Sequence, residues 1–218
     1  MVKKNACIFI SGTGTNLKVL IKNSREYNFP VNIEYIISST KNARGLKLAR
    51  LYKIPFCILN LNKIIDLESA LKELYKKNIS LICLAGYMKI LKKKFINRFN
   101  KKIINIHPSL LPKYKGLNTH KKVLKNKEKF TGCTVHYVND KLDSGKIILK
   151  KKIFVASNDN EKLTGCTVHY VNKKLDSGKI ILKKKVFIES SDNEETLKAK
   201  VQKKEYRAYS ESIISIFR

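Results

Sequence analysis

Residues 6–25 read ACIFISGTGTNLKVLIKNSR, and this stretch decides the fold. The apolar run Ala6–Ser11 predicts a buried strand, and Thr15–Arg25 has the spacing of an amphipathic helix. A glycine turn, SGTGTN at 11–16, joins them. Any tight strand-to-helix turn favours glycine, but glycine also lets the backbone and the first amides of a helix approach an anion. The turn lacks the third glycine of a dinucleotide fingerprint and the Gly-Lys-Ser/Thr of a Walker loop, so it suits a single phosphate.

Strand and helix patterns then alternate along the chain. We expect strands at 33–38, 56–59, 81–86 and 103–107, and helices at 45–52, 68–78 and 119–126. Two extended runs follow at 134–138 and 146–155, and a long helix at 194–218. This order predicts an α/β fold: a Rossmann-like, mostly parallel sheet with helices on both faces and an antiparallel hairpin at the C-terminal end.

One segment of the chain is present twice. Residues 131–152, TGCTVHYVNDKLDSGKIILKKK, recur from residue 164 with a single change, at Asp140. We interpret 131–163 and 164–196 as a tandem duplicate of one hairpin unit inside a single domain that spans the whole chain. Two copies do not make a solenoid, which needs at least about three stacked units. We expect the spare hairpin to extend the sheet edge, pair with another chain or form a poorly ordered loop.

The composition limits the partners. A net charge of +29 would suit nucleic acid or an anionic membrane, but only six of the 46 basic residues are Arg, and the lysines are spread over nearly every polar segment. The five cysteines form no CxxC pair, which argues against a zinc site. No apolar run reaches the length of a membrane span. We therefore expect a cytoplasmic monomer or homodimer that binds no metal, no membrane and no nucleic acid.

The segment NIHPSLLPKYKG, residues 105–116, carries the next candidate chemistry. Asn105 and His107 are two residues apart on a predicted strand, so their side chains lie on the same side of it. A proline then ends the strand, at the position where open α/β sheets bind ligands. A lone His is often structural, but the Asn-x-His-Pro context favours catalysis. The LDSG of Asp143, repeated at Asp176, would alone be an ordinary turn.

Several motifs, in order, resemble the phosphoribosylglycinamide formyltransferase family, folate-dependent enzymes of purine biosynthesis. They are SGTGTNL at 11–17, LAGYMKIL at 84–91, NIHPSLLPKYKGLNTH at 105–120, TVHYVNDKLDSGKIIL at 134–149 and ETLKAKVQKKEY at 195–206. The chain departs from the family at Lys89, where Arg is common, and at Lys115, Asn118 and Ser144, where Pro, His and Gly are frequent. None of these departures removes a functional group from the catalytic residues.

The resemblance implies a role for each matching residue. Gly14, Thr15 and Asn16 would hold the phosphate of glycinamide ribonucleotide, and Glu205 would contact its ribose or glycine end. The folate pocket would be lined by Met88, Lys89, Ile90, Leu91, Asn105, Asp140, Lys141 and Leu142. The catalytic trio would be Asn105, His107 and an LDSG aspartate, Asp143 or Asp176.

The implied reaction needs neither a metal nor a covalent nucleophile. The substrate amine attacks the formyl carbon of 10-formyltetrahydrofolate, and Asn105 and a protonated His107 donate hydrogen bonds to the oxygen that becomes negative. A nearby aspartate would raise the pKa of His107 and relay protons through water. We expect the phosphate turn, imidazole and carboxylate to converge on a common cleft.

Spacing leaves the choice between the copies open. Copy one keeps the family-like separation from His107 to Asp143, whereas copy two keeps that from Asp176 to Glu205. We favour Asp143, because Asp140 resembles an acidic residue that the family often has there. The first copy is also synthesised first, so it can pair with the sheet before the second exists.

Other functions share some of these features. A methionyl-tRNA formyltransferase or a formyltetrahydrofolate hydrolase would use the same Asn-His-Asp trio, but we expect neither a tRNA-binding domain after Arg218 nor a regulatory domain before the first strand. A Lys-rich nucleic-acid-binding protein on this scaffold would need basic residues clustered with aromatic ones. A decaying gene, inactivated by the duplicated hairpin, is the third alternative.

Overall fold

Strand β1 (Lys4–Ile10) lies inside a parallel sheet and is buried from Ala6 onward. The computed structural model describes residues 2–126, 128, 130–139, 142–154, 164–169, 180–186 and 193–217, and of 130, 151–154, 164–169 and 180–186 the backbone alone. The chain divides into two compact units. The first comprises residues 1–105, 138–140 and 213–218, and the second comprises residues 106–137 and 141–212.

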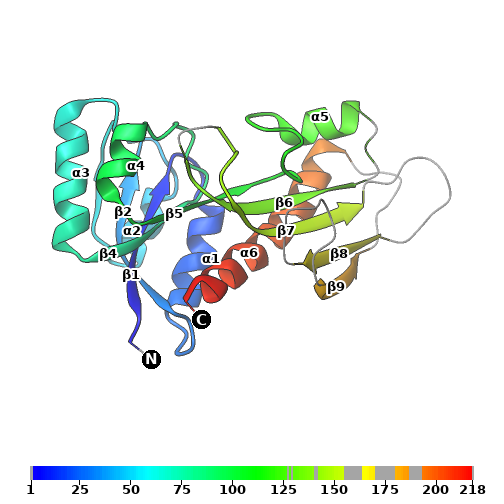
Figure 1. The fold of residues 1–218 in the computed structure, drawn as a ribbon, viewed down its shortest axis with the longest axis horizontal. Coiled ribbons are helices and arrows are strands. Elements are labelled where there is room, and N and C mark those ends of the chain that lie inside the picture. Colours follow the sequence, from blue (N-terminus) through cyan, green and yellow to red (C-terminus); the bar gives the residue numbers. More distant parts are fainter. Residues whose placement is uncertain are drawn as a thin grey trace. The chain divides into compact units, whose positions relative to one another are not determined.

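The first unit is a parallel sheet with the strand order β3-β2-β1-β4-β5 (Figure 1). Besides β1, its strands are β2 (Val31–Ser38), β3 (Phe56–Ile58), β4 (Ile79–Leu84) and the beginning of β5 (Lys102–His107). Its helices are α1 (Thr15–Ser24), α2 (Leu46–Leu51), α3 (Ile64–Lys76) and α4 (Lys93–Phe99). The order reverses at β1, as in doubly wound folds. The predicted mostly parallel α/β architecture is confirmed.

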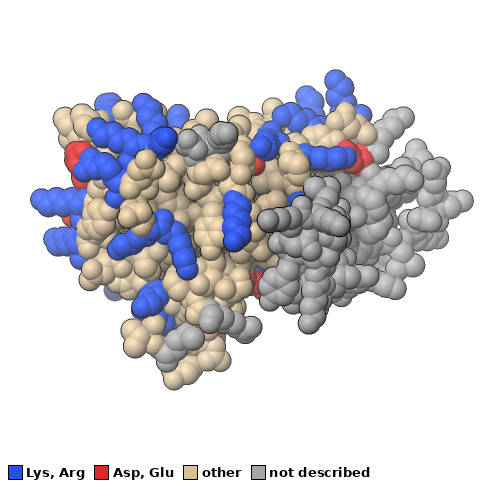
Figure 2. All heavy atoms as spheres, in the orientation of Figure 1, with Lys and Arg blue, Asp and Glu red and all other residues tan. Residues whose placement is uncertain are grey.

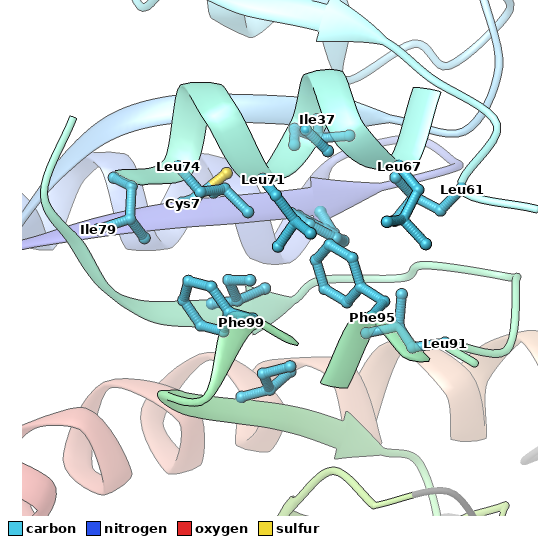
Figure 3. Packing of buried hydrophobic residues seen from close by; sticks show 14 of the residues in the cluster. Cys7, Ile37, Leu61, Leu67, Leu71, Leu74, Ile79, Leu91, Phe95 and Phe99 are labelled. Carbon is cyan, nitrogen blue, oxygen red and sulfur yellow. The ribbon is translucent and has the colours of Figure 1, made fainter. Parts of the chain in front are cut away.

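Both faces of β1 are apolar, so helices must cover both. Side chains alternate between the faces of a strand. Cys7 and Phe9 point to one face, where they join a cluster of buried residues from α3 and α4 (Figure 3). Ala6, Ile8 and Ile10 point to the other face and are equally buried. Helices α1 and α3 lie on opposite sides of the sheet (Figure 1).

Helix α4 is an addition to the predicted elements. Its apolar residues Phe95 and Phe99 are four positions apart and therefore lie on one helix face. Their rings stack with centroids 6.2 Å apart, and the Phe95 ring also lies 5.8 Å from that of Phe9. Three consecutive lysines, 92–94, precede and begin this short helix. Because they are polar, the apolar residues are too few to show helical spacing in the sequence.

Replacing Phe95 tests this packing. Phe95 is fully buried, so Phe95→Ala should lower the free energy of unfolding by about 3–5 kcal/mol, because it leaves a cavity between the helix and the sheet. Ile65, 79% exposed at the start of α3, supplies a matched control, and Ile65→Ala should change stability by no more than about 0.5 kcal/mol. Urea unfolding measures both, and equal effects would contradict the assignment of the core.

The second unit contains an antiparallel sheet with the strand order β6-β7-β8-β9. Its strands are β6 (Phe130–Tyr137), β7 (Ile147–Phe154), β8 (Thr164–His169) and β9 (Ile180–Val186), and its helices are α5 (Thr119–Lys125) and most of α6 (Glu194–Phe217). Strand β8 pairs with β7 through Lys150 opposite His169. The second copy therefore extends this sheet, which is the first of the three outcomes expected for it.

The two copies have the same backbone register. In the first hairpin His136 pairs with Ile147, and in the second His169 pairs with Ile180, each 33 positions later. The register shifts immediately before the histidine in both hairpins, between Val135 and His136 in the first. In the described strands the duplicated sequence thus gives the same pairing twice, including its irregularity.

The charge is spread over the surface. On the face in Figure 2, Lys and Arg side chains are scattered over the described residues rather than gathered in one patch. In the part of the chain that the structure describes, no helix combines the length and the apolar character needed to cross a membrane.

Candidate active site

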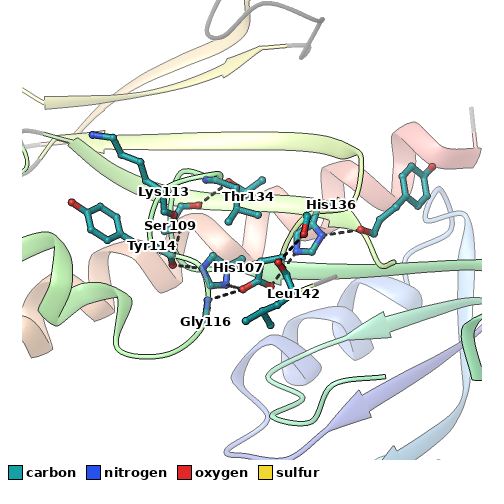
Figure 4. Close-up of polar contacts among 12 residues, drawn as sticks. His107, Ser109, Lys113, Tyr114, Gly116, Thr134, His136 and Leu142 are labelled. Atoms are coloured by element: carbon teal, nitrogen blue, oxygen red, sulfur yellow. Dashed lines mark hydrogen bonds and ion pairs between the residues drawn. The ribbon is translucent and has the colours of Figure 1, made fainter. Parts of the chain in front are cut away.

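His107 ends strand β5 and is 5% exposed within the second unit. Its Nδ1 lies 3.3 Å from Oδ2 of Asp143, and its Nε2 lies 2.8 Å from the carbonyl oxygen of Tyr114 (Figure 4). A carbonyl oxygen can only accept, so Nε2 carries a hydrogen and donates it to Tyr114. The nitrogen that faces the carboxylate is therefore the one that gains and loses the proton.

Asp143 lies in the turn between β6 and β7, where a backbone amide and a second imidazole also approach its carboxylate. The Gly116 amide donates to Oδ2 at 2.8 Å, and Nε2 of His136 lies 3.6 Å from Oδ1. His136 is 2% exposed, and its Nδ1 donates to the Tyr137 carbonyl oxygen. Asp143 has a φ of 46°, a left-handed conformation that Asp tolerates better than most residues. One buried carboxylate thus lies between two imidazoles.

Burial and neighbouring groups shift the pKa values of His107 and Asp143. Burial lowers the pKa of His107, and it outweighs the hydrogen bond to Tyr114 and the Asp143 charge, which act in the opposite direction; His136 and Lys122 lower the pKa further. The expectation that the aspartate raises this pKa is right for the single interaction but wrong for the sum. Burial raises the pKa of Asp143, but hydrogen bonds from His136 and Gly116 and the two imidazole charges bring it below its ordinary value.

The LDSG turn closes against the strand that precedes it. The Tyr137 amide donates to the Lys146 carbonyl oxygen at 2.8 Å. A Cβ atom on Gly145 would lie 1.6 Å from the Tyr137 carbonyl oxygen, so only glycine fits at this position. The carbonyl that Gly145 approaches is the one that orients His136. The glycine therefore brings Asp143 and His136 together.

The glycine turn of 11–16 lies in the first unit and opens α1. Gly14 has a φ of 80°, and a Cβ on it would lie 2.7 Å from Cα of Gly45, so glycine is needed both for the conformation and for the close contact. The first intrahelical bond runs from the Lys18 amide to the Gly14 carbonyl. The amides of Thr15 and Asn16 therefore precede the helical hydrogen-bond ladder.

The sequence profile of the family described as Formyl transferase matches residues 4–163 and, in a second match, residues 156–213. The chain belongs to the formyl transferase family. The second match begins in the interval between the two hairpins, so each hairpin lies in a different one of the two matches.

Two relatives and one solved structure show which members of the family the chain is similar to. The chain is 40% identical over 161 residues to phosphoribosylglycinamide formyltransferase of Haemophilus influenzae, which covers 72% of this chain and 76% of that protein. It is 39% identical over 162 residues to human trifunctional purine biosynthetic protein adenosine-3, covering 72% of this chain but only 16% of that longer protein. The crystal structure of phosphoribosylglycinamide formyltransferase from Anaplasma phagocytophilum matches with a TM-score of 0.77 and 32% identity, over 99% of this chain and 87% of that one.

The structure places the other predicted residues as follows. Met88 and Ile90, after β4 in the first unit, are each 64% exposed, whereas Leu91 is buried in the hydrophobic cluster. Lys89 is also exposed, and the Met88 amide donates to Ser11 Oγ. In the second unit, Leu142 is half exposed and Glu205 is buried on α6. Asp140, Lys141 and Asp176 lie outside the described residues.

Three residues of the cluster were absent from the predicted site. His136 could have been inferred, because few histidines occur in the chain and this one lies on a strand beside LDSG. Tyr114 and Gly116 contribute backbone atoms, a carbonyl and an amide, so their side-chain types carry no signal for the contacts that they make with His107 and Asp143.

Gly145→Ala tests the closure of the first hairpin. The added methyl collides with backbone, so we expect the free energy of unfolding to fall by about 1–3 kcal/mol. Gly12→Ala is the control, because a Cβ on Gly12 meets nothing within 4 Å and should leave stability almost unchanged. Thermal unfolding compares the two variants. A Gly145→Ala protein as stable as the parent would show that the turn can open without cost.

The pH dependence of stability tests the burial of His107. Its folded pKa lies below the unfolded value of about 6.5, so the unfolded chain binds more protons and stability falls as the pH drops through that value. Asp143 contributes stability that is complete above about pH 4, its unfolded pKa, and is lost only in more acidic solution. His120, whose pKa is also lowered by burial, adds a second slope that a His107 variant keeps.

Urea unfolding at about pH 7.5, 6.5 and 5.5 would measure this slope. His107→Gln should show a shallower fall in the free energy of unfolding than the parent chain. A variant whose stability decreases as steeply as that of the parent would show that the titration of His107 is unchanged by folding.

Proposed function

We propose that this chain transfers the formyl group of 10-formyltetrahydrofolate to the amine of glycinamide ribonucleotide, a step of purine biosynthesis. The observation that carries the proposal is the buried contact of His107 with Asp143 in a chain of the formyl transferase family. Its similarity to phosphoribosylglycinamide formyltransferases supports this substrate over those of methionyl-tRNA formyltransferase or formyltetrahydrofolate hydrolase.

His107 would accept and return the proton that the reaction moves. When the substrate amine forms a bond to the formyl carbon, its nitrogen becomes positively charged and must lose a proton. Neutral His107 can take that proton at Nδ1, directly or through a water, because the Asp143 carboxylate 3.3 Å away balances the new charge. The same proton can then go to the folate nitrogen as its bond to the formyl carbon breaks. A pKa lowered by burial keeps His107 neutral and ready to accept at neutral pH.

Asn105 would stabilise the negative charge on the formyl oxygen. It precedes His107 by two positions on β5, and its side-chain amide can donate a hydrogen bond. A donor aimed at a developing oxyanion contributes more than one aimed at a neutral carbonyl. The protonated His107 would add positive charge beside that oxygen until it gives its proton away.

The binding roles follow the resemblance residue by residue. Gly14, Thr15 and Asn16 would bind the phosphate with the first amides of α1, and a phosphate is the kind of group that this turn accommodates. Glu205 would bind the ribose or glycine end of glycinamide ribonucleotide.

The folate donor requires apolar surface, and the chain offers some. Met88 and Ile90 present exposed apolar side chains in the first unit, and Leu142 does so in the second. We propose these residues, with Lys89, Leu91, Asn105, Asp140 and Lys141, as the residues that bind the donor. No metal is proposed, and we expect a protein of the cytoplasm that acts as a monomer or homodimer.

Two matched substitutions test the function and the choice of copy. Asp143→Asn should lower kcat for formyl transfer to glycinamide ribonucleotide by at least about 100-fold, because it removes the charge that balances protonated His107. Asp176→Asn, the same change in the second copy, should leave kcat within about twofold of the parent. Purified proteins with equal circular dichroism spectra are compared.

The other outcomes are equally informative. Loss of activity only in Asp176→Asn would reverse the choice of copy, and two active single variants would show that the copies substitute for one another. A parent chain that transfers no formyl group would overturn the proposed function.

A further inference from the structure

The loop after β5 holds a residue whose backbone controls His107. Tyr114 has a φ of 56°, a left-handed conformation that is costly for a bulky residue and persists only where surrounding contacts impose it. Its carbonyl oxygen accepts the hydrogen bond from His107 Nε2. The direction of that carbonyl therefore decides how the imidazole is turned and which ring nitrogen faces Asp143.

The Tyr114 side chain is held by groups at the end of α5. Its hydroxyl donates to Oε1 of Glu128 at 2.6 Å and accepts from Nδ2 of Asn126 at 3.0 Å, so both its donor and an acceptor site are used. The Glu128 amide donates to the Val123 carbonyl oxygen, which attaches this residue to the helix. The loop is thereby tied to a helix by a charge-assisted hydrogen bond, a stronger type than a bond between neutral groups.

The carboxylate of Glu128 has a second donor. Lys113 Nζ lies 2.8 Å from the same oxygen, but the Lys113 side chain is 66% exposed, so this pair contributes little by itself. The hydrogen bonds from Lys113 and Tyr114 lower the pKa of Glu128, which keeps it ionised at neutral pH. The neighbouring Ser109 Oγ donates to the Lys113 carbonyl oxygen at 2.6 Å and lies 3.4 Å from the Tyr114 carbonyl oxygen, so it steadies the same turn from the other side.

We propose that Glu128 is a positioning residue: by holding the Tyr114 hydroxyl it fixes the Tyr114 carbonyl, and this carbonyl orients the His107 imidazole toward Asp143. The inference rests on the proposed function for its effect on turnover, but not for its effect on the imidazole. Glu128 touches neither His107 nor Asp143 in the contacts that the structure describes, so its role passes through Tyr114.

The expected behaviour follows from which atoms each variant keeps. Glu128→Ala removes the acceptor, and Tyr114→Phe removes the hydroxyl, so both free the Tyr114 side chain from α5. Glu128→Gln keeps an oxygen that can accept from the Tyr114 hydroxyl and loses only the charge. A misoriented imidazole slows the proton transfer more than it weakens substrate binding, since His107 is proposed to act on the reacting atoms.

The experiment combines kinetics with the nitrogen signals of the imidazole. In formyl transfer to glycinamide ribonucleotide, Glu128→Ala and Tyr114→Phe should each lower kcat by about tenfold, with KM for both substrates within about twofold of the parent. Glu128→Gln should recover most of kcat. Glu68→Ala, which removes a carboxylate from the exposed pair with Arg98, is the matched control and should have the parent's kcat.

Nitrogen-15 correlation spectra of the histidine rings supply the readout that a merely structural role would not move. In the parent, His107 should carry its hydrogen on Nε2. In Glu128→Ala and Tyr114→Phe, the spectra should instead show a mixture of the two tautomers. The pKa of His107 should also be lower in these variants, because the hydrogen bond to Tyr114 raises that pKa. If Glu128→Ala fails to fold, Tyr114→Phe carries the test.

Unchanged ring signals and unchanged kcat in a folded Glu128→Ala or Tyr114→Phe protein would overturn the proposal. So would a loss of kcat that Glu128→Gln shares in full while the His107 signals stay as in the parent. If the parent chain transfers no formyl group, the proposed function fails, and the ring signals of the variants still decide whether Glu128 positions His107.

Discussion

The structure of the second unit depends on how one buried carboxylate is stabilised. A carboxylate removed from water must be paired and hydrogen-bonded, or it will take up a proton. The Gly116 amide donates to the Asp143 carboxylate, and one nitrogen of each of two imidazoles faces it. Three local features of the chain bring these groups together. They are a register shift in β6 before His136, a loop that brings Gly116 back to β5, and a glycine at 145 that lets the turn close.

The two imidazoles are arranged in the same way. In each ring, one nitrogen donates to a backbone carbonyl, of Tyr114 for His107 and of Tyr137 for His136, and the other nitrogen faces Asp143. Backbone carbonyls only accept hydrogen bonds, so in each ring the hydrogen on the nitrogen that faces the carbonyl is fixed by that contact. The two carbonyls thereby set the orientation of both rings relative to the carboxylate.

Much of the first unit could be predicted because local pattern and global fold agree there. The strands around β1 are short and apolar, the helices between them have helical spacing, and the glycine turn at 11–16 has the composition that its geometry demands. Helix α4 was not predicted, because lysines precede and begin it and only Phe95 and Phe99 form its buried face.

The sequence identified two side chains that the structure brings together, but not the backbone groups that contact them. His107 and Asp143 are separated by 36 positions and could be paired only through the family resemblance, and the structure brings them to 3.3 Å. The contacts of Tyr114 and Gly116 use atoms that every residue has, so no sequence pattern records them. The net direction of the His107 pKa could not be foreseen either, because it depends on burial, which the sequence does not show for a single side chain.

The sheet accommodates the second copy because the edge of β7 can pair with a strand of the same sequence as β6. Strand β8 repeats the sequence of β6 and pairs with β7, whose other neighbour is β6 itself, so β7 lies between two strands of the same sequence. The hairpin registers are the same, and side-chain patterns alone do not distinguish the copies. Lengthening a connection costs only about 0.6 kcal/mol per doubling, so loop entropy does not choose strongly either. The repeated segment even begins upstream of β6, since Glu161 matches Glu128, the residue that holds the loop of His107. The first copy is attached to a helix: it follows α5 directly, and the Glu128 amide donates to the Val123 carbonyl oxygen before the strand begins.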